Sequence, residues 1–145
     1  MQDFPHLYKV AAAAGPDGEV CLDCEGLDTI ASAAPVEFDG PGGKWSPETL
    51  LPAAVADCFI LTFRAIARAS KLEWASLECE VEGTLERREH VTLFTAFTLQ
   101  ATLTVPPDTD GERARRLLEK AEAGCLITNS LSAGIHLDAT VSKAA

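Results

Sequence analysis

The fold of this chain is decided by the stretch SPETLLPAAVADCFILTF, which occupies residues 46–63. Ser46 is suited to cap a helix, and Pro47 fits the first helical position because its missing N–H would have no partner there. Glu48 lies favourably near the positive end of the same helix. The pattern therefore predicts a long helix over residues 47–70.

Almost every residue between Leu50 and Phe63 is apolar, on whichever side of the helix it lies. A helix with one apolar stripe lies on a core, whereas a helix that is apolar on all sides is surrounded. One sheet of a 145-residue chain covers only one side of such a helix. We therefore expect a second copy of the chain to cover the other side. Polar residues return along a single stripe that comprises Asp57, Arg64, Arg68 and Lys71.

Strands are predicted both before and after this helix in the sequence. After the helix, apolar and polar residues alternate in two long runs, which is the pattern of an antiparallel hairpin with one solvent-exposed face. Strands that precede and follow a long helix, without strict alternation, indicate an α+β fold with antiparallel sheets and a single domain over residues 1–145. The predicted elements are strands at 19–24 and 29–38, the long helix, strands at 77–87 and 91–105 with a turn at 87–90, a helix at 111–123 and a strand at 135–141.

Composition and charge exclude several classes of partner. The chain is 47% hydrophobic and 23% charged, as in ordinary globular proteins, and its formal net charge is −10. Nucleic acid and anionic membrane surfaces attract cationic proteins, so we expect neither as a partner. No run of 18 apolar residues predicts a membrane span, and no signal-like segment is visible. Five cysteines, an odd number, favour a reducing compartment, and we expect a cytoplasmic protein.

The cysteines leave several interpretations open. Cys58 lies in the long helix, and Cys125 continues the apolar stripe of the helix at 111–123, so both point toward the interior. They are either small core residues or two thiols that meet. Cys21 and Cys24 form a C-x-x-C pair, but no second pair with zinc-ligand spacing exists, and no metal site is predicted. Cys79 falls on the apolar face of a predicted strand and is expected in the core.

Two segments together resemble the OsmC/Ohr family of osmotically induced and organic-hydroperoxide-resistance thiol peroxidases. The order of the segments and the spacing between their cysteines match that family, and the resemblance covers essentially the whole chain. It implies an intertwined α+β homodimer with the long helices sandwiched between sheets of both copies. The matching segments are EFDG at residues 37–40, SPETLL at 46–51 and AAVADCF at 53–59 in the first, and AEAGCLITNSL at 121–131 in the second.

The resemblance also implies a chemistry and its residues. Cys58 would be the peroxidatic cysteine, which reduces a small organic hydroperoxide and becomes a sulfenic acid. Cys125 would be the resolving cysteine, and Glu48 matches a carboxylate at the start of the family's helix. No cofactor is implied. A dithiol, which the resemblance suggests is a lipoyl-bearing protein, would reduce the resulting disulfide.

One departure from the family pattern concerns electrostatics. The family pairs its carboxylate with a catalytic arginine, but residues 1–63 contain no arginine. Cys58 lies three turns into the helix, where the positive helix end no longer acts, and a buried thiol without a cation is mostly protonated. Lys44 is the candidate cationic activator, with Arg64, Arg68 or a residue of a second copy as alternatives. The competing hypothesis is an OsmC-fold small-molecule-binding or interaction protein without peroxidase activity.

Overall fold

The computed structural model describes all residues, 1–145, as two compact units, Met1–Leu50 and Leu51–Ala145. The mixed α+β class expected from the sequence is confirmed. The long helix α1 (Pro47–Ala69) begins in the N-terminal unit and continues without interruption through Pro52.

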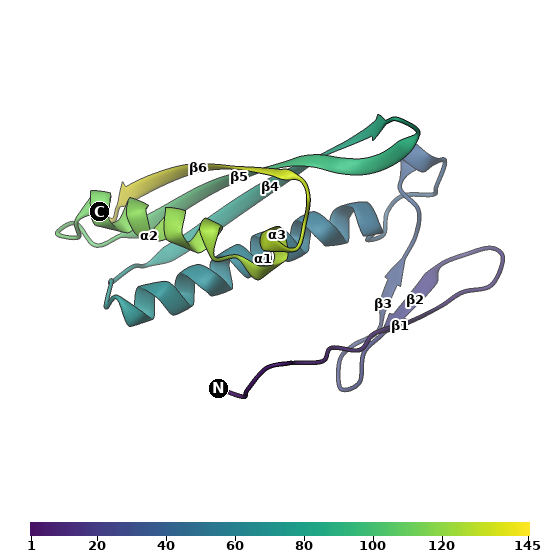
Figure 1. Ribbon diagram of the computed structural model, residues 1–145, viewed down its shortest axis with the longest axis horizontal. Helices are drawn as coiled ribbons and strands as arrows, with labels where there is room; N and C mark the ends of the chain where they lie inside the picture. The colour runs from purple at the N-terminus through teal and green to yellow at the C-terminus, as the bar shows by residue number, and fades with distance from the viewer. The chain divides into compact units, whose positions relative to one another are not determined.

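The N-terminal unit holds a three-stranded antiparallel meander (Figure 1). Its strands are β1 (Ala11–Ala13), β2 (Val20–Asp23) and β3 (Ile30–Ser32), in the spatial order β1-β2-β3. The strand β1 was not predicted, because three alanines carry no alternation. The extended piece predicted to reach residue 38 ends instead at Ser32, and a short 3₁₀ helix, η1 (Val36–Phe38), follows it.

The turn after η1 explains why the chain leaves the extended conformation. Asp39 adopts a left-handed φ of 58°, and the N–H of Gly40 donates to the carbonyl of Pro35 at 3.0 Å. A Cβ on Gly40 would lie only 2.0 Å from the carbonyl oxygen of Ala34, so only glycine fits. This turn brings the chain to Ser46, where α1 is capped.

Ser46 caps α1 as the sequence predicts. Its Oγ accepts a hydrogen bond from the N–H of Thr49 at 3.3 Å, and its own N–H donates to Thr49 Oγ1 at 2.9 Å. These two bonds satisfy donors that every helix start leaves unpaired. Because the side chain of Ser46 is almost completely buried, the start of α1 is a well-defined point in the fold.

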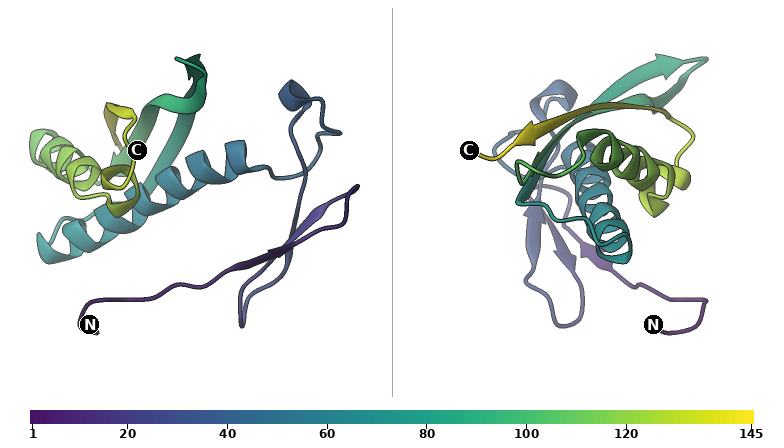
Figure 2. Two further views of the ribbon diagram at one scale, coloured as in Figure 1. Left: turned by 45° about the vertical axis from the view of Figure 1, so that its right-hand side comes forward. Right: turned by 90° about the vertical axis from the view of Figure 1, so that its left-hand side faces the viewer.

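The C-terminal unit is a three-stranded sheet with helices on one face (Figures 1 and 2). Its strands β4 (Ser76–Arg88), β5 (Val91–Val105) and β6 (Gly134–Lys143) lie in the order β4-β5-β6. The predicted hairpin β4–β5 is confirmed, and Glu89 and His90 make its two-residue turn with positive φ. The strand β6 pairs with β5 in parallel. The expectation of an antiparallel sheet was therefore wrong for this pair of strands.

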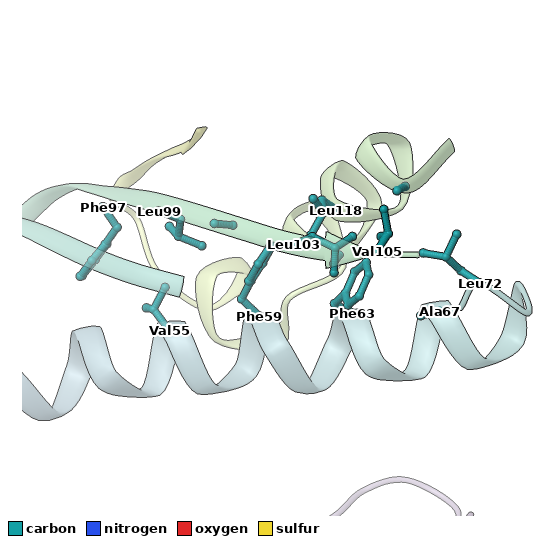
Figure 3. Close-up of a cluster of buried hydrophobic side chains, with 13 residues drawn as sticks. Val55, Phe59, Phe63, Ala67, Leu72, Phe97, Leu99, Leu103, Val105 and Leu118 are labelled. Carbon is teal, nitrogen blue, oxygen red and sulfur yellow. The ribbon is translucent and has the colours of Figure 1, made fainter. Parts of the chain in front are cut away.

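The core of this unit lies between α1, β5 and α2 (Gly111–Ala123), as Figure 3 shows. Helix α1 contributes one residue per turn, and β5 contributes every second residue. A very short helix, α3 (Leu126–Asn129), follows α2 and was not predicted. The fully or almost fully buried residues of α1 and β5 are Val55, Phe59, Phe63, Ala67, Phe97, Leu99, Ala101, Leu103 and Val105.

Within the C-terminal unit, the sheet and α2 cover one side of α1. The stripe from Val55 to Ala67 packs on the core, whereas Leu61 on another side is 50% exposed. By length and composition alone, α1 could cross a membrane, but the buried central helix of a water-soluble protein has the same properties. The C-terminal unit itself supplies no layer on the side of α1 that carries Leu61.

Candidate active site

Cys58 opens onto an apolar groove of about 490 Å³ in the C-terminal unit. One wall is formed by residues spaced three and four apart on α1, and the other wall is formed by the start of α3. Asp57 is the one charged side chain in this lining, and no lysine or arginine belongs to it. The lining comprises Ala54, Asp57, Cys58, Leu61, Thr62, Ala65, Leu126 and Ile127.

Cys125 lies at the sharp junction between α2 and α3. The N–H of Gly124 ends α2 by donating to the carbonyl of Lys120 at 3.0 Å, and Cys125 then takes an extended conformation at the start of α3. Its side chain is 1% exposed, as the apolar stripe of α2 predicts. This junction brings the thiol of Cys125 to that of Cys58, near enough for each to shift the pKa of the other, although the two residues are 67 positions apart in the sequence.

Hydrogen bonds make Cys58 the more acidic of the two thiols. Burial opposes ionisation and is the largest single influence on its pKa. Hydrogen bonds from the backbone of Ile127, the thiol of Cys125, the hydroxyl of Thr62 and the backbone of Leu126 act in the opposite direction, and the pKa of Cys58 is lowered. A lowered pKa increases the thiolate fraction, and the thiolate is the nucleophilic form.

Cys125 shows the opposite shift. Burial raises its pKa, hydrogen bonds with the backbone and side chain of Thr128 oppose that effect, and the neighbouring Cys58 raises the pKa further. Because the shifts have opposite signs, Cys58 is the thiol of the pair that ionises more readily.

The remaining cysteines lie outside this arrangement. Cys79 packs against the hydrophobic core, as predicted, where burial and the nearby Cys125 raise its pKa to about 11. It is therefore protonated at neutral pH. Cys21 is exposed on β2, and the thiol of Cys24 donates to the backbone carbonyl of Lys9 at 3.5 Å. No three His, Cys, Asp or Glu side chains are grouped in a way that could hold a metal ion.

The two other predicted site residues belong to the N-terminal unit. Lys44 Nζ pairs with Glu19 Oε1 at 3.3 Å, and both side chains are about half exposed. Glu48 lies in the first turn of α1 and lines an apolar cavity of about 500 Å³, where its buried Oε2 has no hydrogen-bond partner. The roles of Lys44 as activator and of Glu48 as catalytic carboxylate stay predictions.

Sequence reasoning missed the groups that surround the sulfur of Cys58. Thr62 could have been found, because a residue four positions later lies on the same face of a helix. The backbone N–H groups of Leu126 and Ile127 carry no signal in residue type. Their direction depends on the turn at Gly124 and Cys125, which no periodicity reveals.

Fold and site together define an α+β protein whose long central helix carries a thiol paired with a second, sequence-distant thiol. Residues 40–140 match the family described as OsmC-like protein, and the chain belongs to this family. The resemblance found in the sequence is thereby confirmed.

Individual relatives agree with this membership. An uncharacterized protein of Bacillus subtilis, YmaD, is 28% identical over 135 residues, which cover 91% of this chain and 90% of the relative. A Vibrio cholerae OsmC-like protein of unknown function has a TM-score of 0.85 at 15% identity, over 93% of this chain and 99% of that one. A Legionella pneumophila structure has a TM-score of 0.76 at 25% identity, over 97% of this chain and 99% of that one.

The names of these relatives bear on function at the level of the family. The Legionella pneumophila protein is named an organic hydroperoxide resistance protein OsmC and a predicted redox protein. Redox chemistry is thus associated with the family, which includes peroxidases, and its members are typically dimeric.

Proposed function

We propose that this protein is a cysteine-based peroxidase that reduces organic hydroperoxides, with Cys58 as the peroxidatic and Cys125 as the resolving cysteine. The observation that carries the proposal is a pair of neighbouring thiols, with pKa values shifted in opposite directions, at an apolar groove. An inert core cysteine would have its pKa raised by burial, as Cys79 does. The redox association of the family supports the same conclusion.

In the first step, the Cys58 thiolate attacks the terminal oxygen of the hydroperoxide. The S–O bond forms as the O–O bond breaks, and the alkoxide that leaves takes a proton from water and becomes the alcohol. Sulfur loses two electrons and becomes a sulfenic acid, while the peroxide gains them. The apolar lining of the groove suits the hydrocarbon part of the substrate.

In the second step, the sulfur of Cys125 attacks the sulfur of the sulfenic acid. The S–S bond forms as the S–O bond breaks, and the leaving hydroxide combines with the proton of Cys125 to give water. A dithiol, for which we propose a lipoyl-bearing protein, then reduces the disulfide by thiol–disulfide exchange. We place the protein in the cytoplasm, where dithiols are kept reduced.

Stoichiometric oxidation tests this proposal directly. Titration of the reduced protein with cumene hydroperoxide is expected to consume two thiols per chain and to produce a peptide in which Cys58 is linked to Cys125. In Cys125→Ser the reaction is expected to stop at the sulfenic acid, which dimedone traps on Cys58. Thiol counting and peptide mapping by mass spectrometry measure both results.

The matched control is Cys79→Ser, since Cys79 is a half-buried thiol that lies near Cys125 but has no proposed role. It is expected to consume the same two thiols. Thiol counts that stay unchanged after peroxide treatment would favour the competing hypothesis, a binding or interaction protein without peroxidase chemistry.

We further propose that a second copy of the chain covers the open side of α1. Leu61 of α1 and Leu126 of α3 both border the Cys58 groove and are 50% and 66% exposed, and exposed apolar side chains that lie together mark interaction surfaces. Light scattering after size exclusion is expected to give the mass of two chains. Leu61→Glu, which places a charge on this side, is expected to shift the protein toward the monomer.

Val91→Glu is the control for this experiment, because Val91 is 57% exposed at the hairpin end of β5. Its mass is expected to equal that of the unmodified protein. A monomer that pellets with lipid vesicles would contradict the dimer and would mean that a bilayer covers α1.

A further inference from the structure

Thr62 lies one helical turn after Cys58 and shares the groove with it. Its Oγ1 is 3.8 Å from Cys58 Sγ, within hydrogen-bond range for sulfur, and this is the hydrogen bond formed by its hydroxyl. Threonine in a helix commonly bonds instead to the carbonyl four residues earlier. The methyl group of Thr62 is directed toward Gly124, where a Cβ would lie 3.7 Å from it. The hydroxyl lies on the side of the sulfur.

The direction of this hydrogen bond depends on the charge of the sulfur. In the thiol form either atom can donate, but a thiolate has no proton, so the hydroxyl of Thr62 must then be the donor. Hydrogen bonds to an ionised acceptor are roughly twice as strong as those between neutral groups. The contact therefore favours the thiolate over the thiol.

Within one chain, the groove lining around Cys58 contains no lysine or arginine, and Asp57 is its one charged side chain. Hydrogen bonding by the backbone of Ile127 and Leu126 and by the thiol of Cys125 acts in the same direction as that of Thr62 and lowers the pKa of Cys58. Uncharged donors are therefore the groups of this chain that favour a negative charge on the sulfur.

We propose that Thr62 is a positioning residue that holds the sulfur of Cys58 as a thiolate by donating its hydroxyl hydrogen bond. Together with the backbone donors of Leu126 and Ile127, it favours the charged form of this sulfur. This inference deepens the proposed function and rests on it, because the thiolate is the species that attacks the peroxide.

The test compares Thr62→Val, which exchanges the hydroxyl for a methyl group of the same shape, with Thr62→Ser, which keeps the hydroxyl. The measurement is the rate of Cys58 alkylation by iodoacetamide between pH 5 and pH 10, resolved by peptide mass spectrometry. In Thr62→Val the pH midpoint of the alkylation profile is expected to rise by about one pH unit. This corresponds to a thiolate fraction about tenfold smaller at pH values below the midpoint. Thr62→Ser is expected to keep the original midpoint.

Two controls separate this effect from damage to the fold. The exposed Cys21 reports the activity of the reagent in the same samples, and its alkylation is expected to be identical in all variants. Thr62→Ala is a second variant without the hydroxyl and is expected to shift the midpoint in the same direction. An unchanged midpoint in Thr62→Val and Thr62→Ala would overturn the inference.

The alkylation midpoint requires no peroxide, so this test and that of the proposed function fail independently. A raised alkylation midpoint in Thr62→Val supports the role of Thr62 whether or not the unmodified protein reduces peroxide. If the unmodified protein leaves peroxide intact, that result overturns only the proposed function. Where peroxide is reduced, kcat/KM below the midpoint is expected to fall about tenfold in Thr62→Val and to recover in Thr62→Ser. If the enzyme is active and Thr62→Val keeps both the original alkylation midpoint and the original kcat/KM, then Thr62 contributes only to packing and the inference is overturned.

Discussion

Cys58→Ser is expected to lower kcat/KM for cumene hydroperoxide by at least about a thousandfold, because the attacking nucleophile is removed. A serine hydroxyl is not ionised at neutral pH, and the hydrogen bonds that lower the pKa of the Cys58 thiol cannot convert it to an alkoxide. The measurement is the rate of peroxide loss in the presence of excess dihydrolipoamide. Sulfur and oxygen differ little in size, so the helix around position 58 is expected to stay folded.

The control is Cys21→Ser, which removes an exposed thiol from the N-terminal unit. It is expected to keep the full rate. Retention of more than a tenth of the activity in Cys58→Ser would mean that another group reduces the peroxide, and the assignment of Cys58 as the peroxidatic cysteine would then be abandoned.

Phe59→Ala is expected to lower the free energy of unfolding by about 3–5 kcal/mol, since it leaves a large cavity in the core. Phe59 is completely buried and, with Phe63, belongs to the cluster that joins α1 to β5 and α2 (Figure 3). Urea unfolding at fixed protein concentration, followed by circular dichroism, measures the change. Loss of this contact would also disturb the neighbouring Cys58, so activity is expected to fall with stability.

Phe4→Ala is the matched control, because it makes the same chemical change at a side chain that is 81% exposed. Its effect on the free energy of unfolding is expected to stay below about 1 kcal/mol. Equal unfolding midpoints for Phe59→Ala and the unmodified protein would show that α1 does not pack on the sheet through this residue.

The long elements could be predicted because their periodicity is strong. Alternation over β4 and β5 predicts the hairpin to within a residue or so at each strand end, and capping at Ser46 predicts the start of α1. The short elements β1 and α3 were not predicted, since they contain only three and four residues. The direction of β6 also escaped, because a strand shows the same alternation whether it pairs in parallel or antiparallel.

Some properties of the candidate site could be predicted from the sequence, and others depend on the folded structure. Residue type and spacing were enough to predict the family, the inward direction of Cys125 and the need of α1 for a further layer beyond one sheet. The meeting of Cys58 with Cys125, and the hydroxyl and backbone donors that this chain places at the sulfur of Cys58, became visible only in the folded structure. Backbone N–H groups are the same in every non-proline residue, so their direction depends on how the chain folds and leaves no trace in residue type.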